Sequence, residues 1–178
     1  MNIKHEDCGA RSAIENDAAL LCRWWNDGTV MEHAGFPDGL GIDVDAVMRI
    51  IGKNGAARHL MIIEVDRMPV GEMHYRSRGD DTAEIGIKIC ALQYRERGYG
   101  SRFLEMLIDY LFRECACERI VLDTNVRNER AQHVYEKLGF KETGRRIDSW
   151  RDQRGELQSV VDYELVRPST PNTERHTP

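Results

Sequence analysis

The sequence predicts a single α/β domain with a mixed, mostly antiparallel sheet and flanking helices. Its length of 178 residues is typical of one domain, and 41% of the residues are hydrophobic. Short β-type runs and helical runs alternate along the chain, as expected for an α/β fold. A strong helical run lies between two of the β runs, which implies a parallel crossover. We therefore expect a parallel strand pair that splays apart near the centre of the sheet.

The first part of the chain predicts an edge strand over residues 2–7 and two helices. Apolar positions spaced i, i+3, i+4, i+7 predict a helix over Ala18–Trp25. A similar period predicts a second helix that is capped by Asp43 and continues to Ile51. Five glycine and proline residues lie between the two helices: Gly28, Gly35, Pro37, Gly39 and Gly41. They predict a long irregular loop, and loops of this length are usually functional.

The middle of the chain predicts an antiparallel meander followed by the strongest helix. The three strands of the meander are Leu60–Val65, Pro69–Tyr75 and Thr82–Cys90. The helix is predicted over Gly100–Glu114, because apolar residues repeat there at helical spacing without an internal glycine or proline. A strand over Arg119–Asp123 follows it.

The last part of the chain predicts a helix and a closing hairpin. Asn128 caps a helix that continues to Leu138, and Gly139 ends it. The hairpin is predicted over residues 141–150 and 157–166. We assign residues 1–167 to the domain and expect the proline-rich tail, residues 168–178, to be disordered.

Composition excludes several classes of function. The 25 basic and 30 acidic residues give a net charge of −5, which does not favour a nucleic-acid partner. No apolar run approaches the roughly 18 to 20 residues that span a bilayer, and the first residues do not resemble a signal peptide. We expect a soluble cytoplasmic protein without a membrane partner. Five cysteines without a CxxC pair predict reduced thiols and no metal site.

A glycine-containing turn precedes the strongest predicted helix. Gly98 and Gly100 allow the backbone to approach a ligand closely, and the N–H groups of the first helical turn favour phosphate. A dinucleotide fingerprint is excluded because Phe103 stands where its third glycine belongs, and no P-loop Gly-Lys-Ser/Thr follows. On these residues alone, a purely structural turn remains an equal alternative.

Two motifs identify a family resemblance. The string Arg95–Gly100 resembles the R/Q-x-x-G-x-G/A acyl-CoA signature of the GNAT superfamily of N-acetyltransferases. Asn128–Phe140 is similar to that superfamily's N-x-x-A-x-x-x-Y-x-K-x-G-F segment, and the two motifs occur in the same order. The resemblance covers residues 3–167. Glu84–Ile87 and Trp25–Asp27 are further similar to the branch that contains ribosomal-protein-alanine and spermidine acetyltransferases.

The resemblance implies a GNAT fold and acetyl-CoA as the co-substrate, with no metal. The pyrophosphate would lie on the backbone of Arg97–Gly100, and the pantetheine arm would run along one strand. Asn128 would serve as a helix cap, as a cofactor contact, or as both. The implied cofactor-binding residues are Ile87, Lys88, Ile89, Arg95, Arg97, Gly98, Tyr99, Gly100 and Asn128.

The resemblance also implies two catalytic residues. A protonated amine must lose a proton before it attacks a thioester, and Glu84 is the implied base. The alternative is that Glu84 pairs with a basic side chain. Tyr135 is the implied acid that protonates the departing thiolate, and its alternative is a core aromatic residue.

The acceptor would lie between the segment Trp24–Gly41 and the closing hairpin, as in the family. Trp25, Glu32, His33 and Phe36 could enclose a cationic amine, although tryptophans on a short helix are more often part of the core. We expect acetylation of a primary amine on a small molecule, such as an amino acid, a polyamine or an aminoglycoside. The alternatives are acetylation of a protein N-terminus, which needs an open groove, and a non-catalytic acyl-CoA-binding sensor. A homodimer is left open, because no residue specifies an interface.

Overall fold

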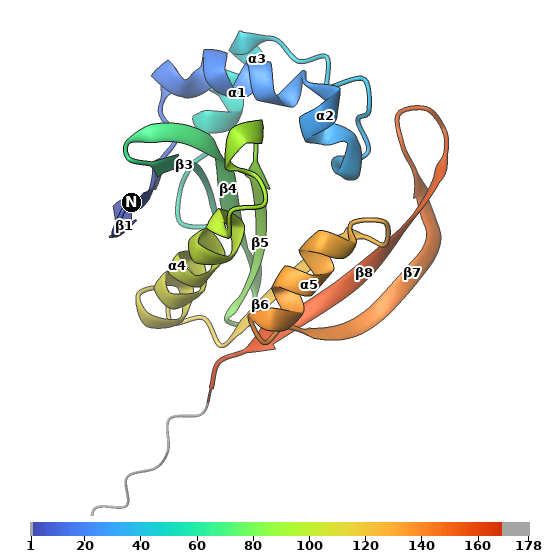
Figure 1. Ribbon diagram of the computed structural model, residues 1–178. Helices are drawn as coiled ribbons and strands as arrows, with labels where there is room; N and C mark the ends of the chain where they lie inside the picture. The colour runs from blue at the N-terminus through green and yellow to red at the C-terminus, as the bar shows by residue number, and fades with distance from the viewer. Residues whose placement is uncertain (1, 169–178) are drawn as a thin grey trace, which may run out of the picture.

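An eight-stranded sheet forms the centre of the computed structural model, which describes residues 2–168. The strand order is β1-β2-β3-β4-β5-β6-β8-β7, and only β5 and β6 are parallel neighbours (Figure 1). The strands are β1 (Asn2–His5), β2 (Cys8–Ser12), β3 (Arg58–Val65), β4 (Met68–Gly79), β5 (Thr82–Ile89), β6 (Arg119–Asn125), β7 (Lys141–Arg151) and β8 (Leu157–Val166). The expected mixed sheet is therefore confirmed. The predicted tail lies outside the described residues, apart from Pro168.

Helices cover both faces of the sheet. They are α1 (Ala18–Trp25), α2 (Gly28–Met31), α3 (Val44–Ile51), α4 (Tyr99–Arg113) and α5 (Glu129–Lys137), with the short 3-10 turns η1 (Glu15–Asp17), η2 (Glu32–Ala34) and η3 (Leu92–Tyr94). The predicted caps are present: Asp43 accepts a hydrogen bond from the Ala46 N–H at 2.7 Å, and Asn128 accepts one from the Ala131 N–H at 3.3 Å. Within residues 2–168, no helix has both the length and the apolar character needed to cross a bilayer.

Two predictions near the N-terminus are corrected by the structure. The single strand predicted over residues 2–7 is a hairpin of β1 and β2, with Glu6 in the turn at a φ of 54°. Strand β2 escaped prediction because only Cys8 and Ala10 mark its buried face. The loop predicted over residues 28–41 contains α2 and η2. Asp27 caps α2 by accepting from the Thr29 N–H at 2.8 Å, and four residues are too few to show a helical period.

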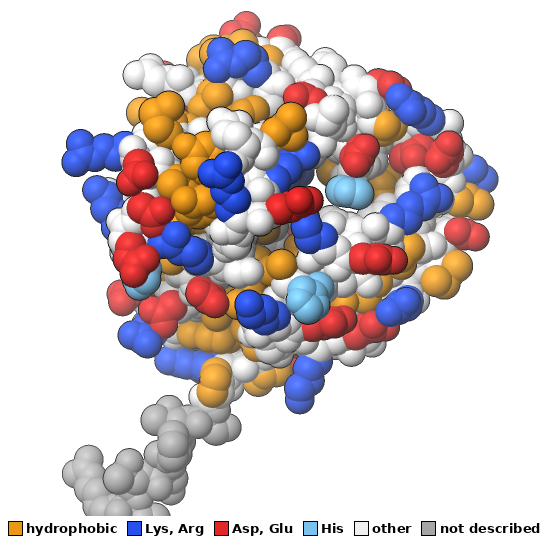
Figure 2. All heavy atoms as spheres, in the orientation of Figure 1, with side chains coloured by type: hydrophobic (Ala, Val, Ile, Leu, Met, Phe, Trp, Pro, Cys, Tyr) orange, Lys and Arg blue, Asp and Glu red, His pale blue; other side chains and the backbone are white. Residues whose placement is uncertain are grey.

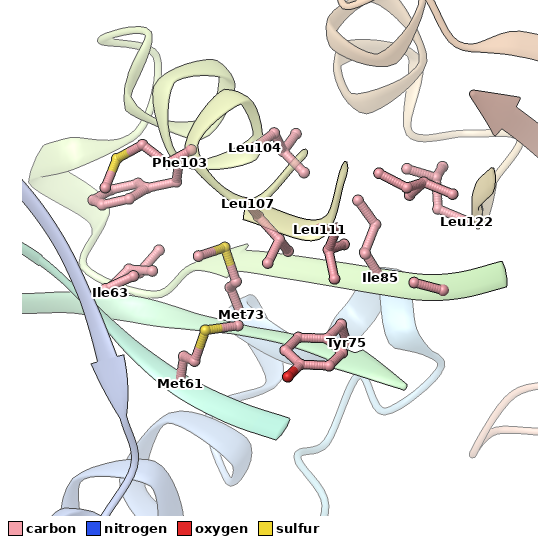
Figure 3. Packing of buried hydrophobic residues seen from close by; sticks show 14 of the residues in the cluster. Met61, Ile63, Met73, Tyr75, Ile85, Phe103, Leu104, Leu107, Leu111 and Leu122 are labelled. Carbon is pink, nitrogen blue, oxygen red and sulfur yellow. The ribbon is translucent and has the colours of Figure 1, made fainter. Parts of the chain in front are cut away.

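The core consists of two clusters on opposite faces of the sheet. Alternating residues of β3 supply both, since Met61 and Ile63 face α4 whereas Leu60 and Ile62 face α1 and α3. Figure 3 shows four side chains of α4 above the sheet residues that they cover: Phe103, Leu104, Leu107 and Leu111 above Met61, Ile63, Met73, Tyr75 and Ile85. Because helices bury both faces, β3 is apolar on both sides over residues 60–63.

The same alternation positions the site on β5. Ile85 packs in the α4 cluster, so Glu84, Gly86 and Lys88 face the opposite side, toward α1 and α2. Strand β4 is antiparallel to β5, with His74 directly opposite Gly86. Polar groups of β4 and β5 are therefore collected on one face of the sheet.

Candidate active site

A cavity of about 770 Å³ opens where β5 and β6 separate. The two strands pair only over residues 82–84 and 119–121, although β5 continues to Ile89. The cavity lies between β5, β6, the N-terminus of α4, helix α5 and the η2 segment. On the face seen in Figure 2, basic and acidic side chains are interspersed, with no broad region of one sign. The expected splay of the parallel pair is thus the location of the candidate site.

The unpaired edge of β5 forms one wall of the cavity. Ile87, Lys88 and Ile89, predicted to bind pantetheine, all line it. The Ile89 carbonyl accepts a hydrogen bond from Arg95 Nε at 3.0 Å, which ties the following loop to the end of the strand. Beyond Glu84 the backbone has no partner in β6, so an extended ligand arm could pair with it as an additional strand.

The glycine turn forms the next wall. Gly98 is the N-cap of α4 with a φ of 80°, and side chains built at Gly98 or Gly100 would meet open space. The first N–H groups of a helix have no acceptor within that helix. This exposed backbone at the start of a helix of 15 residues fits a pyrophosphate group. Both glycines of the motif therefore lie at this exposed start of α4.

The two arginines of the motif differ in position. Arg95 lines the cavity, and its guanidinium also donates to the Thr29 carbonyl at 3.4 Å. Arg97 is exposed and does not line the cavity. Tyr99 lines the cavity, while its hydroxyl donates to Asp7 at 3.3 Å. Arg95 therefore contributes positive charge to the cavity wall. Tyr99 connects the same wall to the β1–β2 turn.

Tyr135 on α5 is a core aromatic residue that also lines the cavity. Its ring packs against Phe140 and Tyr163, and the residue lines the cavity. Within residues 2–168 its hydroxyl has no hydrogen-bond partner, and no polar side-chain atom there is both buried and unpaired. The hydroxyl is therefore open to the cavity. Burial raises the pKa of Tyr135 to about 12, so its proton is retained at neutral pH. Asn128, the cap of the same helix, also lines the cavity.

Glu84 lines the cavity as an ion-paired carboxylate. Arg76 binds one of its oxygens and Arg78 binds the other. Arg76 lies directly opposite Glu84 in the β4–β5 register, so the pairing is built into the sheet. This is the alternative that the sequence left open for Glu84. Both carboxylate oxygens of Glu84 are therefore occupied by guanidinium groups.

The four residues predicted to bind the amine fall into two groups. Glu32 and His33 line the cavity, with His33 Nε2 3.6 Å from a Glu32 oxygen. Trp25 and Phe36 instead belong to the core beneath α1 and do not line the cavity. Trp25 turns toward the sheet, where its indole Nε1 donates to the buried Glu72 at 3.2 Å.

Several lining residues were missed by the sequence reasoning. They include His74 on β4, Asp123, Thr124 and Asn125 on β6, Arg146 and Trp150 on β7, and Val160 on β8. Arg146 bridges Asp123 at 2.6 Å and Asp162 at 2.8 Å. One signal was available: a glycine within a strand indicates close approach of another group, and a side chain at Gly86 would overlap the His74 ring.

A buried ion pair lies beside the cavity. Lys88 Nζ is 2.9 Å from a Glu72 oxygen, and Glu72 is only 3% exposed. Burial is the largest influence and opposes ionisation of Glu72. The charge of Lys88, together with the hydrogen bonds from Lys88 and Trp25 and other smaller contributions, nevertheless holds the pKa of Glu72 below its ordinary value. The same pair raises the pKa of Lys88. Both groups therefore remain charged at neutral pH, and Lys88 contributes a fixed cation to the cavity wall. No group of three or more metal-ligating side chains is found within residues 2–168.

Comparisons with known proteins agree with this geometry. The family model described as acetyltransferase (GNAT) domain matches residues 10–141. An uncharacterized N-acetyltransferase of Bacillus subtilis, YnaD, is 26% identical over 132 residues, which cover 72% of this chain and 75% of YnaD.

Solved structures show the same fold. Spermidine N-acetyltransferase from Vibrio cholerae, in complex with CoA and spermine, has a TM-score of 0.81 at 19% identity, covering 91% of this chain and 96% of the other. RimL, a ribosomal L7/L12 alpha-N-protein acetyltransferase in complex with CoA, has a TM-score of 0.83 at 16% identity. The match covers 93% of this chain and 98% of the RimL chain.

Proposed function

The chain belongs to the GNAT family of acetyltransferases, and we propose that it transfers the acetyl group of acetyl-CoA to a primary amine of a small molecule. The proposed acceptor classes are amino acids, polyamines and aminoglycosides. The amine attacks in a ternary complex, so both substrates occupy the cavity at the same time. The exposed backbone at Gly98–Gly100 and along Ile87–Ile89 fits the pyrophosphate and pantetheine parts of acetyl-CoA.

The observation that supports a small acceptor is the contact between the β7–β8 hairpin and residues 35–39, which we call the hairpin closure. In Figure 1 the hairpin tip reaches toward the segment that follows α2. Gln153 makes three hydrogen bonds there: its N–H donates to the Gly35 carbonyl at 2.9 Å, its side chain accepts from the Asp38 N–H at 3.0 Å, and its amide donates to the Gly39 carbonyl at 2.9 Å. Arg154 adds an ion pair with Asp38.

Trp150 completes the closure. Its ring lies so close to Gly35 that a side chain at that position would overlap it. Trp150 also lines the cavity together with Glu32 and His33. A cavity bordered by Trp150, Glu32 and His33 in this way suits a small amine, whereas a protein N-terminus needs an open groove through which the polypeptide can leave.

Tyr135 is proposed as the acid that protonates the departing thiolate. Its open hydroxyl and its pKa of about 12 make it a proton donor at neutral pH. Tyr135→Phe removes this proton and keeps the ring that packs on Phe140. Acid catalysis of this type is worth roughly 10² to 10⁴ in rate, so kcat should fall by about that factor.

The experiment measures release of free CoA from acetyl-CoA with lysine, spermidine, kanamycin and an alanine-initiated peptide. We expect turnover with at least one small amine, at a kcat/KM at least about tenfold above that of the peptide. Tyr135→Phe should bind CoA as the wild type does and lose turnover. Preference for the peptide would favour the protein N-terminal acetyltransferase, and CoA binding without turnover of any acceptor would favour the sensor.

A further inference from the structure

We propose that His74 on β4 is the base that takes a proton from the acceptor amine, an inference that rests on the proposed function. His74 lines the cavity beside β5. The absence of a side chain at Gly86 makes room for its ring, since any side chain at position 86 would overlap it. The ring therefore covers the strand that is proposed to hold the acetyl donor.

The register of the sheet places His74 beside the reacting position. It lies directly opposite Gly86, two residues beyond the last β5–β6 pair, which is Glu84 with Val121. This is where the β5 backbone first becomes free to pair with a ligand. His74 also faces the side of the sheet on which η2 and the hairpin form the acceptor end. The imidazole thus lies on the cavity wall beside Gly86, next to the proposed thioester position.

The ring nitrogens of His74 are free to bind substrate. Within residues 2–168 no group hydrogen-bonds to them, and no buried polar side-chain atom is left unpaired, so they open onto the cavity. The carboxylates nearby are engaged: Glu84 binds Arg76 and Arg78, and Glu72 binds Lys88 and the Trp25 indole. His74 is therefore better placed than either glutamate to accept a proton.

The electrostatic surroundings keep the imidazole neutral. Burial lowers the pKa of His74 below its ordinary value; Glu72 and Glu84 oppose this shift, while Lys88 and Arg58 reinforce it. The charged or titratable groups around the ring come from β3, β4, β5 and η2: Arg58, Glu72, Glu84, Lys88, Glu32 and His33. A neutral imidazole is the form that accepts a proton, and His74 holds this form at neutral pH.

The proton balance of the transfer uses both His74 and Tyr135. His74 takes one proton from the ammonium group, and the resulting neutral amine attacks the thioester carbonyl carbon. The C–N bond forms and the C–S bond breaks, and the sulfur receives a proton from the Tyr135 hydroxyl. The nitrogen then gives its second surplus proton back to Tyr135, and His74 releases its proton to water. The products are the N-acetyl amide, free CoA and one proton.

The test compares His74→Gln with His133→Gln, which changes an exposed histidine of α5 that does not line the cavity. Rates are measured against pH with acetyl-CoA and whichever of lysine, spermidine or kanamycin gives the highest turnover. We expect His74→Gln to lose about 10² to 10³ in kcat and to lose the acid limb of the wild-type kcat/KM profile. CoA affinity should be unchanged. His133→Gln should keep the acid limb.

A second variant distinguishes a catalytic role of His74 from a purely structural one. His74→Gly leaves a space the size of an imidazole beside Gly86, and added imidazole should restore part of the lost rate. No such rescue is expected for Tyr135→Phe. Wild-type kcat and an unchanged acid limb in His74→Gln, with the wild type active, would overturn the role of His74 and leave the proposed function standing. A wild type that binds no CoA would overturn the proposed function and this inference with it.

Discussion

The cofactor side of the cavity is built from backbone, whereas the acceptor side is built from side chains. The cofactor side comprises the free edge of β5 over residues 87–89 and the turn Gly98–Gly100, two segments separated by eight residues of the chain. The acceptor side comprises His74, Glu32, Arg146 and Trp150, which come from three distant parts of the chain. Recognition by backbone requires particular local conformations, so it leaves a local motif. Recognition by side chains from distant parts of the chain leaves no local motif in the sequence.

The largest expected effect concerns the buried Glu72–Lys88 ion pair beside the cavity. Glu72→Gln leaves the Lys88 ammonium without its carboxylate, and breaking a buried pair costs about 3 kcal/mol when the remaining charge is partly hydrated. The pKa of Glu72 is below its ordinary value of 4.5 in the fold. Its stabilisation is therefore present above about pH 4.5 and is lost as the pH falls through the folded pKa.

The measurement is urea denaturation of the wild type and Glu72→Gln between pH 7 and pH 3. Glu118→Gln, which changes an exposed ion pair with Arg167, is the matched control and should cost under about 1 kcal/mol. The difference between wild type and Glu72→Gln should shrink as the pH falls. A difference that is small at pH 7, or that grows on acidification, would show that the pair does not stabilise the fold.

The next effect concerns the backbone of the cofactor side. Gly98→Asp places a carboxylate at the proposed pyrophosphate position, and we expect a loss of CoA affinity on the order of 100-fold. Gly79→Asp is the control, because Gly79 has a φ of 84° against 80° for Gly98 and equally open surroundings. Both variants carry the same backbone strain. Calorimetric titration with CoA should therefore separate them, and equal affinities would place the cofactor elsewhere.

A smaller effect is expected at the hairpin closure. Gln153→Ala removes the two side-chain hydrogen bonds to residues 38 and 39, each worth roughly 1 kcal/mol. The KM for the amine should rise about tenfold, while the affinity for CoA stays unchanged. Steady-state kinetics with Gln93→Ala, an exposed glutamine beyond β5, provide the comparison. A rise in the KM for acetyl-CoA instead would contradict the division between the two sides.

The smallest effect is expected at Arg97. Its side chain is exposed and does not line the cavity, so its attraction to phosphate is screened by water and salt. Arg97→Ala should change CoA affinity by no more than about twofold at physiological salt. A tenfold loss in a salt titration would show that side-chain charge, as well as backbone, binds the cofactor.

The same division explains what could be predicted from the sequence. Periodicity over eight or more residues predicted α1, α3 and α4 almost to the residue, and the helix between the Thr82 and Arg119 strands correctly predicted the parallel pair. Strand β2 and helix α2 were missed because runs of four or five residues carry too little pattern.

The site follows the same rule. The glycine turn, the Asn128 cap and Tyr135 could be located because local motifs contain them. The orientation of the Trp25 side chain could not be predicted in this way. It depends on the hydrogen bond to Glu72, which is 47 residues away in the sequence. Likewise, the approach of His74 to Gly86 depends on the register between two strands, which no local pattern of residues specifies.

A crystal structure of the protein with CoA and the acetylated product of the preferred amine would test the account most directly. We predict the pyrophosphate on the N–H groups of Gly98–Gly100 and the pantetheine arm paired with Ile87–Ile89. The product nitrogen should lie about 2.6 to 3.2 Å from a His74 ring nitrogen, or one water away. CoA bound outside the β5–β6 opening, or a product nitrogen on the far side of Glu84 from His74, would contradict it.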